Sequence, residues 1–264
     1  MNLDLDGCGV LVTGASGAIG GAAARAFAAE GARVAVHYHR NAEAAEALAS
    51  ELAGVAIRAD LTDQAETAAL FAAARDHLGS LDVCVANAGV RAGHPTPLWE
   101  LELERWRATV DGNLTAAFLT SREYLRHVAA AGAGSLVLVA STAAVFGEAG
   151  NADYAAAKAA IAYGLALSLK NEIVQVAPGG RVNVVAPGWT TNPMSGRALD
   201  DEALARATAT MPLRKVARLE DIASAIVWIS SPTAAGHVSG ELLTVAGGLE
   251  GRLLHANGGP PWRP

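Results

Sequence analysis

Short, nearly continuous runs of apolar residues alternate along this chain with longer, alanine-rich segments. The short runs predict strands at Gly9–Val12, Arg33–Tyr38, Val55–Ala59, Val83–Ala86, Ser135–Ala140, Arg181–Val185 and Leu242–Val245. Because these runs are apolar throughout, and not only at every second position, they are typical of parallel strands that are buried on both faces of a sheet.

The segments between the strands predict helices at Ala18–Glu30, Ala42–Leu52, Gln64–His77, Leu103–Ala131, Ala152–Val176 and Glu220–Ser230. Regular alternation of strand and helix indicates βαβ units. We therefore predict an α/β fold, a doubly wound parallel seven-stranded sheet with helices on both faces. No linker or repeat divides residues 1–250, which form one predicted domain, and residues 251–264 form a C-terminal tail.

Composition and charge exclude several classes of protein. Of the 264 residues, 52% are hydrophobic and 17% are charged, which is typical of a globular chain. The net charge of −6 and the absence of a long basic run argue against a nucleic-acid partner. The most apolar long segment, Tyr154–Leu169, is interrupted by Lys158 and is too short to span a membrane.

The two cysteines, Cys8 and Cys84, lie within apolar runs, where a small buried hydrophobic residue is the simplest interpretation. They provide neither a disulfide framework nor a metal cluster. The first residues lack the basic and apolar regions of a secretory signal. We expect a cytoplasmic protein without a metal site.

The first predicted strand leads into a turn with glycines at positions 14, 17 and 20, and then into a helix. Small residues at such a turn let the backbone approach a diphosphate, which the N-terminus of the helix attracts. The spacing G-x-x-G-x-x-G differs from the dinucleotide fingerprint G-x-G-x-x-G. A turn that only packs the helix tightly against the strand is the alternative.

The end of the second predicted strand bears on the choice of cofactor. It contains His37, His39, Arg40 and Asn41, with no carboxylate before Glu43. A carboxylate there would bind the ribose 2′-hydroxyl of NAD, whereas Arg40 can pair with the 2′-phosphate of NADP. This favours NADP over NAD, and a merely solvated strand end is the alternative.

Tyr154 and Lys158 are spaced i and i+4 in an alanine-rich predicted helix, so that both side chains lie on one face. A nearby cation lowers the pKa of a tyrosine, which is about 10 when unperturbed. Such a phenol can exchange a proton with a ketone or an alcohol. Ser141, at the end of the fifth predicted strand, either bonds a substrate carbonyl or only caps a turn.

In their order and spacing, these motifs resemble the short-chain dehydrogenase/reductase family in its compact, single-domain, Rossmann-like form, similar to 3-oxoacyl-(acyl-carrier-protein) reductases. The resemblance extends from Thr13 to Gly248. Besides the motifs above, it rests on Asp60 and Leu61, Asn87 to Gly89, Asn113, Pro187 and Gly188, Ser239 and Gly240, and Gly247 and Gly248.

This resemblance implies a catalytic set of Asn113, Ser141, Tyr154 and Lys158. Tyr154 would be the general acid in reduction, and Ser141 would orient the substrate oxygen. Lys158 would bind the nicotinamide ribose and lower the pKa of Tyr154. Asn113 would bend its helix and hold a water that links Lys158 to solvent.

The resemblance also implies which residues contact the cofactor. Asp60 would meet the adenine amino group, and the backbone near Thr190 would hold the carboxamide. The full set is Gly14, Ser16, Gly17, Ile19, Gly20, Arg40, Asn41, Asp60, Leu61, Asn87, Gly89, Tyr154, Lys158, Pro187, Gly188 and Thr190. The chain departs from the family pattern at Ala18, Asn192 and Ala246, where glycine, threonine and aspartate are usual.

These expectations favour an NADP-dependent carbonyl reductase that acts on a medium-sized, partly apolar ketone or secondary alcohol, such as a 3-oxoacyl thioester or a biosynthetic intermediate. The alternatives are an isomerase or epimerase with a tightly held cofactor, and a non-catalytic cofactor-binding regulator. Candidate substrate-pocket residues are Arg91, His94, Trp189, Met194 and Met211, and the loop from Pro187 to about Leu199 is a candidate lid.

The predicted helix at Ala152–Val176 is apolar nearly all round. The sheet can cover only one side of it, so we expect a partner subunit on the other side. The family resemblance implies a homotetramer, with a homodimer as the alternative assembly, and burial by loops of the same chain would remove the need for a partner.

Overall fold

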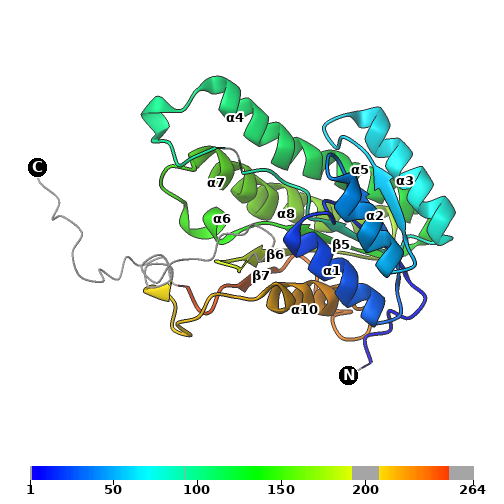
Figure 1. Ribbon diagram of the computed structural model, residues 1–264. Helices are drawn as coiled ribbons and strands as arrows, with labels where there is room; N and C mark the ends of the chain where they lie inside the picture. Colours follow the sequence, from blue (N-terminus) through cyan, green and yellow to red (C-terminus); the bar gives the residue numbers. More distant parts are fainter. Residues whose placement is uncertain (1, 92, 192–207, 250–264) are drawn as a thin grey trace, which may run out of the picture.

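The computed structural model describes residues 2–91, 93–191 and 208–249 (Figure 1). Its sheet has seven parallel strands in the order β3-β2-β1-β4-β5-β6-β7. The strands are β1 (Gly9–Val12), β2 (Arg33–Tyr38), β3 (Val55–Arg58), β4 (Val83–Ala86), β5 (Ala133–Val139), β6 (Gly179–Pro187) and β7 (Leu242–Val245). This confirms the predicted doubly wound, Rossmann-like sheet, in which the direction of the strand order reverses between β1 and β4.

Helices cover both faces of the sheet (Figure 1). They are α1 (Ala18–Ala29), α2 (Ala42–Glu51), α3 (Gln64–Leu78), α4 (Leu103–Val110), α5 (Ala116–Ala131), α6 (Thr142–Phe146), α7 (Ala152–Ala159), α8 (Ala166–Val176) and α10 (Leu219–Ser230). One buried cluster joins α3, α5 and α8 to the sheet, and the other joins α1, α2 and α10 to the opposite face. The apolar strands thus fill two cores, one on each side.

Two of the predicted helices contain a wider turn. The π-helical segment η2 (Asp111–Thr115) joins α4 to α5, and a second one, η3 (Ala160–Leu165), joins α7 to α8. A π turn places one extra residue in the helix and is frequent at functional sites. The bend that the family resemblance assigned to Asn113 corresponds to η2.

Sequence reasoning also missed two short helices, α6 and the 3-10 segment η1 (Leu98–Glu100). Neither is long enough to show a hydrophobic period. Of the candidate lid, Pro187 ends β6, residues 188–191 are described, and residues 192–199 lie outside the described residues.

The cysteine prediction is half correct. Cys84 is fully buried in β4, but Cys8 is only partly buried. The reason is its position before β1, where the chain has not yet entered the sheet. Within the described ranges, no helix has the length and apolar character needed to cross a membrane.

The fold brings distant segments together at one edge of the sheet. Thr13, Asn87 and Ser141 follow the carboxyl ends of β1, β4 and β5, which are adjacent, and Pro187 ends β6 beside them. Ligands of open α/β sheets bind at this edge, next to the point where the strand order reverses. The candidate site lies there.

Candidate active site

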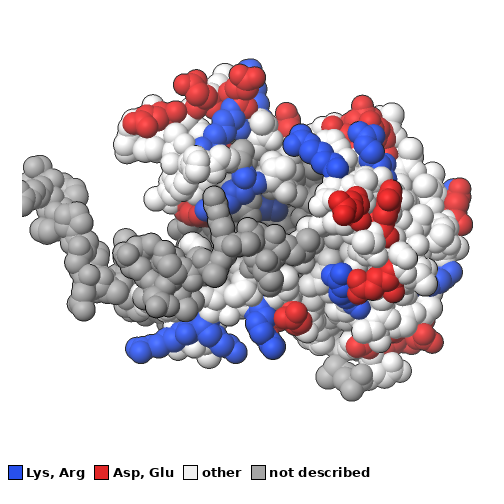
Figure 2. Space-filling model, viewed as in Figure 1, with Lys and Arg blue, Asp and Glu red and all other residues white. Residues whose placement is uncertain are grey.

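A cavity of about 910 Å³ opens at the carboxyl edge of the sheet. Figure 2 shows a hollow in this face of the molecule with Lys and Arg side chains around it. Every residue of the predicted catalytic and cofactor sets lines this cavity except Asn41. One continuous cavity therefore contains both candidate sites.

The glycine turn forms the wall of the cavity between β1 and α1. Gly14 has φ +64°, a conformation that L side chains rarely adopt. A Cβ at Gly20 would lie 2.5 Å from the Gly14 carbonyl oxygen, so a larger residue does not fit there. Gly17 precedes α1 without a capping side chain, which leaves the first N–H groups of the helix for an anion.

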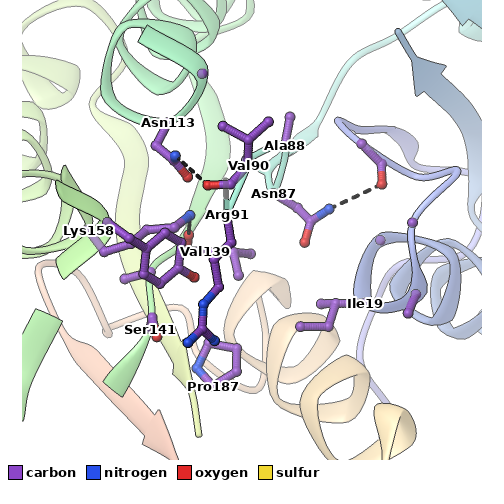
Figure 3. A pocket seen from close by; sticks show the side chains of 18 of the residues that line it. Ile19, Asn87, Ala88, Val90, Arg91, Asn113, Val139, Ser141, Lys158 and Pro187 are labelled. Carbon is purple, nitrogen blue, oxygen red and sulfur yellow. Dashed lines mark hydrogen bonds between the residues drawn. The ribbon is translucent and has the colours of Figure 1, made fainter. Parts of the chain in front are cut away.

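Thr13 and Asn87 fix the position of this turn. The Asn87 side-chain amide donates to the carbonyl oxygens of Thr13 at 2.9 Å and of Gly14 at 3.3 Å (Figure 3). The Thr13 hydroxyl accepts from the backbone N–H groups of Asn87 and Ala88. β1 and β4 are thereby joined at the site, and the Asn87 side chain is used for this support.

His37 is a support that sequence reasoning missed. Its imidazole is buried, with Nδ1 accepting from the Gly14 N–H at 2.9 Å and Nε2 lying 3.1 Å from the Ala59 carbonyl oxygen. Burial lowers the pKa of His37 to about 4, so the ring is neutral and Nε2 carries the proton. The sequence does contain a hint of this role, because His37 lies within an apolar predicted strand, where a histidine is expected to be buried and hydrogen-bonded.

Arg40 and Asn41, which are neighbours in the sequence, differ in their position relative to the cavity. Arg40 is exposed, lines the cavity and makes no hydrogen bond or ion pair with any described residue. Asn41 caps α2, with its side-chain oxygen accepting from the Ala44 N–H at 3.2 Å, and it does not line the cavity. The structure therefore assigns the Asn41 side chain to the cap of the helix, and its contact with the cofactor stays a prediction.

Asp60 lies at the same end of the cavity. Its Oδ1 accepts from the Thr62 hydroxyl at 2.7 Å and from the Thr62 N–H at 2.9 Å, and these bonds lower the pKa of Asp60. Oδ2 lies 3.7 Å from His39 Nε2. The carboxylate is thus ionised at neutral pH, and Leu61 adds an apolar wall beside it.

The tyrosine, lysine and serine meet at the other end of the cavity. Lys158 is buried and donates to the Val139 carbonyl oxygen at 2.9 Å, while its Nζ lies 5.8 Å from the centre of the Tyr154 ring. Burial lowers the pKa of Lys158 to about 8. Figure 3 shows Lys158 and Ser141 on the same side of the pocket.

Burial raises the pKa of Tyr154, whereas the resemblance led us to expect that Lys158 lowers it. The expectation is wrong for this structure, because removal of the phenol from water outweighs the groups that favour the phenolate. Those groups are a hydrogen bond with Ser141 and the charge of Arg91. A phenol with a raised pKa keeps its proton at neutral pH.

Ser141 caps a short helix, as one of the two interpretations of the sequence expected, and its contact with a substrate carbonyl stays a prediction. Its hydroxyl oxygen accepts from the Ala143 N–H at 3.1 Å and caps α6. The same side chain makes the hydrogen bond with Tyr154. The cap holds the hydroxyl in place at the end of β5.

Asn113 lies in the π-helical segment η2. Its amide nitrogen donates to the carbonyl oxygens of Val90 and Thr109, both at 2.8 Å (Figure 3). Its Oδ1 is buried and has no hydrogen-bond partner among the described residues. A Cβ at Gly89 would lie 2.6 Å from this oxygen and 3.2 Å from Lys158 Nζ, so the glycine keeps the space between them open.

A buried carboxylate next to Tyr154 was also missed. Asp153 accepts from the Thr109 hydroxyl at 2.8 Å and from Arg105 Nε at 3.1 Å. Arg105 also donates to the carbonyl oxygen of His94 at 2.8 Å. This network ties the segment after β4 to the first turn of α7.

The last group of predicted residues follows β6. A Cβ at Gly188 would lie 2.7 Å from the Ala246 side chain, so this position requires glycine. The Thr190 hydroxyl donates to the Gly188 carbonyl oxygen at 3.0 Å. Of the candidate substrate residues, Arg91 and Trp189 line the cavity, His94 and Met211 do not, and Met194 lies outside the described residues.

The residues present fit a nicotinamide dinucleotide. Glycines 14 and 20 leave a cradle that a Cβ would fill, α1 offers free N–H groups, and Arg40 offers an unpaired cation. The unpartnered oxygen of Asn113 lies at the end where the nicotinamide would sit. The volume of the cavity is at the upper end of the range of ligand sites.

Comparisons with known proteins agree with this description. The family model described as enoyl-(acyl carrier protein) reductase matches residues 14–250. A cis-4-hydroxycyclohexanecarboxylate dehydrogenase of Sinomonas cyclohexanicum is 39% identical over 243 residues, which cover 90% of this chain and 94% of the relative. The 3-oxoacyl-(acyl-carrier-protein) reductase FabG of Escherichia coli (strain K12) is 32% identical over 249 residues, 94% of this chain and 99% of the relative.

Among solved structures, a 7α-hydroxysteroid dehydrogenase complexed with NADH and 7-oxo glycochenodeoxycholic acid matches with a TM-score of 0.85 and 32% identity. The match covers 96% of this chain and 98% of that chain.

The fold and the site define a nicotinamide-dependent oxidoreductase. The chain belongs to the short-chain dehydrogenase/reductase family, as its motifs indicated. It is an enzyme of the oxidoreductase class that acts on hydroxyl or keto groups. This favours the oxidoreductase over the isomerase and the non-catalytic regulator.

His37 makes the stability of the protein depend on pH. The pKa of His37 is about 4 in the folded chain, whereas that of a histidine exposed to water is 6.5. The contribution of the neutral ring is complete above pH 6.5 and is lost as the pH falls toward 4, because the unfolded chain binds the proton first. We expect a loss of ~3 kcal/mol over this range.

Urea unfolding of His37→Gln at pH 7 and pH 5 measures this contribution. The free energy of unfolding should vary less with pH in this variant than in the wild type, and His237→Gln, at an exposed histidine, should keep the full dependence. An unchanged pH dependence in His37→Gln would contradict the assignment.

Proposed function

We propose that this protein is an NADP-dependent carbonyl reductase that transfers a hydride between NADP(H) and a medium-sized, partly apolar ketone or secondary alcohol, with residues 1–250 as the catalytic domain. The observation that carries the proposal is the arrangement at the two ends of one cavity. Tyr154 and Ser141 lie at one end, and Arg40, which has no partner among the described residues, lies at the other. Such a cavity can hold a donor of hydride and a donor of a proton side by side.

The chain's own residues account for cofactor binding. The glycine turn and the start of α1 bind the diphosphate, Arg40 pairs with the 2′-phosphate, and Asp60 meets the adenine amino group. Lys158 binds the nicotinamide ribose, and the backbone near Thr190 holds the carboxamide. NADPH supplies the hydride when it is bound.

Protonation of the substrate falls to Tyr154. Its raised pKa keeps the proton on the phenol oxygen at neutral pH, ready for donation to the carbonyl oxygen. The Ser141 hydroxyl orients that carbonyl. Lys158, with its pKa lowered to about 8, and a water on the free oxygen of Asn113 return a proton to the phenol.

The relatives support the reaction class, and one of them leaves the cofactor open. Their names include dehydrogenases of a hydroxycyclohexane acid and of a hydroxysteroid, as well as a 3-oxoacyl reductase. The solved hydroxysteroid dehydrogenase carries NADH. In this chain the choice of NADP rests on Arg40 and on the lack of a carboxylate at the end of β2.

Replacement of the proton donor tests the mechanism. Tyr154→Phe should lower kcat for ketone reduction by about 10²–10⁴-fold, because only the acid is lost. NADPH binding, measured by its fluorescence, should stay within a few-fold. Activity is followed as NADPH oxidation with cyclic ketones, 4-oxocyclohexanecarboxylate and 3-oxoacyl thioesters, and Tyr163→Phe is the matched control. Undiminished turnover in Tyr154→Phe would refute the role of this tyrosine.

The cofactor preference is tested at the other end of the cavity. Arg40→Asp should shift the ratio of kcat/KM for NADPH to that for NADH by roughly 10–100-fold toward NADH, since a cation that pairs with phosphate becomes an anion that repels it. Arg75→Asp, on a helix away from the cavity, controls for the change in net charge. A ratio that does not move in Arg40→Asp contradicts the assignment.

We also propose that the chain forms a homotetramer, with a homodimer as the smaller alternative. Four large apolar side chains on the neighbouring helical segments α5, η3 and α8 are 39–49% exposed. They are Phe118, Tyr163, Leu167 and Val174, which we term the apolar helix face. The loops that the structure describes do not bury these side chains, and a patch of this kind marks a protein interface.

Light scattering coupled to size exclusion tests the assembly. The wild type should elute with the mass of four chains, and Leu167→Glu should shift the mass to smaller species, because a buried unpaired carboxylate destabilises an apolar interface. Glu172→Gln, a polar exchange on the same helix, should leave the mass unchanged. A monomeric wild type would contradict the proposed assembly.

A further inference from the structure

Two opposite charges lie in the cavity near the proposed proton donor. Arg91, in the segment after β4, has its guanidinium carbon 5.9 Å from the centre of the Tyr154 ring, and it extends into the pocket in Figure 3. Its Nη2 is paired with the carboxylate of Glu148, which follows α6. Both residues line the cavity.

Stability does not account for this pair. The Arg91 side chain is 48% exposed, and ion pairs that water reaches contribute only about 0–1 kcal/mol. A cation over an aromatic ring gains attraction, but an exposed one gains little. The position of Arg91 beside the phenol therefore calls for a role in binding.

The guanidinium also has donors to spare. Its pairing with Glu148 uses Nη2, and no described residue accepts from Nε or Nη1. A planar guanidinium presents its donors as a fork that matches a carboxylate. Arg91 can therefore bind a second carboxylate through these remaining donors.

Apolar side chains complete this part of the cavity. Val90, Phe146 and Trp189 line it, and all three are large hydrophobic residues left exposed by the chain. Exposed apolar groups next to a few polar ones are typical of ligand pockets. They fit a substrate with an apolar carbon frame.

We propose that the substrate carries a carboxylate on a compact apolar frame, and that Arg91 binds this carboxylate while Tyr154 and Ser141 bind the reacting oxygen. The inference rests on the proposed carbonyl reductase and adds the chemical class of the substrate. Glu148, held by a hydrogen bond from the Asn151 side chain at 3.1 Å, competes with the substrate carboxylate for Arg91. The two residues together set the preference for an acid over a neutral ketone.

A matched pair of probes tests the proposal in the intact protein with NADPH. The probes are 4-oxocyclohexanecarboxylate and its methyl ester, which share the ring and the ketone and differ in charge. The measured quantity is the ratio of kcat/KM for the acid to that for the ester. Effects of a substitution on Tyr154, on the cofactor or on folding cancel in this ratio.

The wild type should prefer the acid. Arg91→Gln should lower the ratio roughly 10–100-fold, which corresponds to the free energy of a hydrogen bond to a charged group. Arg91→Lys should fall between them, because lysine keeps the charge and loses the fork. Glu148→Gln should raise the ratio, since it removes the competing carboxylate. A ratio that is unchanged in both Arg91→Gln and Glu148→Gln would overturn the proposal.

A binding measurement separates this inference from the proposed function. Cyclohexanecarboxylate has no ketone, so its affinity, measured by calorimetry, does not depend on turnover. The wild type should bind it at least about tenfold more tightly than Arg91→Gln does. Equal affinities of the wild type and Arg91→Gln would overturn the role of Arg91, even if the enzyme reduces the ester. Tighter binding by the wild type, together with no reduction of any ketone, would contradict the proposed carbonyl reductase and leave the role of Arg91 intact.

Discussion

The buried ammonium of Lys158 is the constraint on which the site depends. A buried charge is costly unless it is hydrogen-bonded, and Lys158 meets this condition through the Val139 carbonyl oxygen at the end of β5. This bond fixes α7 against the sheet and therefore fixes Tyr154, one turn earlier, beside Ser141. Asn113 and Gly89 lie on the other side of the ammonium. Gly89 leaves the space next to Lys158 Nζ open, and the Asn113 Oδ1, which has no partner among the described residues, borders that space.

At the other end of the cavity, buried neutral groups are likewise fixed by hydrogen bonds to the backbone. His37, Thr13 and Asn87 are buried or partly buried polar residues whose bonds end on the backbone of the glycine turn or beside it. A change in the shape of the turn would leave one of these buried polar groups without a hydrogen bond, which costs free energy, so the turn has few alternative conformations. The site is thus rigid where phosphate is expected to bind. Its exposed cations, Arg40 and Arg91, lie where ligand groups are expected to differ.

The sequence predicted the strands and the main helices because their apolar runs are long enough to show a pattern. It predicted that Tyr154 and Lys158 lie close together because their spacing of four residues places both side chains on one face of a helix. It did not predict α6 or the π segments, which depend on local hydrogen bonds. Nor did it predict the raised pKa of Tyr154 or the neutral state of His37, since burial is a property of the packed chain. Nor did it predict that Asn41 caps α2, because a capping side chain and a ligand-binding one look alike in sequence.

The charges of the cavity also explain how one scaffold can serve different substrates. Lys158 is enclosed and bound to the backbone, so its position is set by the fold. Arg91 is bound to another side chain on an exposed segment, and a change at position 91 or 148 alters the charge of the pocket without disturbing the sheet. The proposed catalytic groups, which the backbone supports, and the proposed specificity groups, which side chains support, are therefore separable in this protein. Such a division allows the substrate to change while the proton donor stays in place.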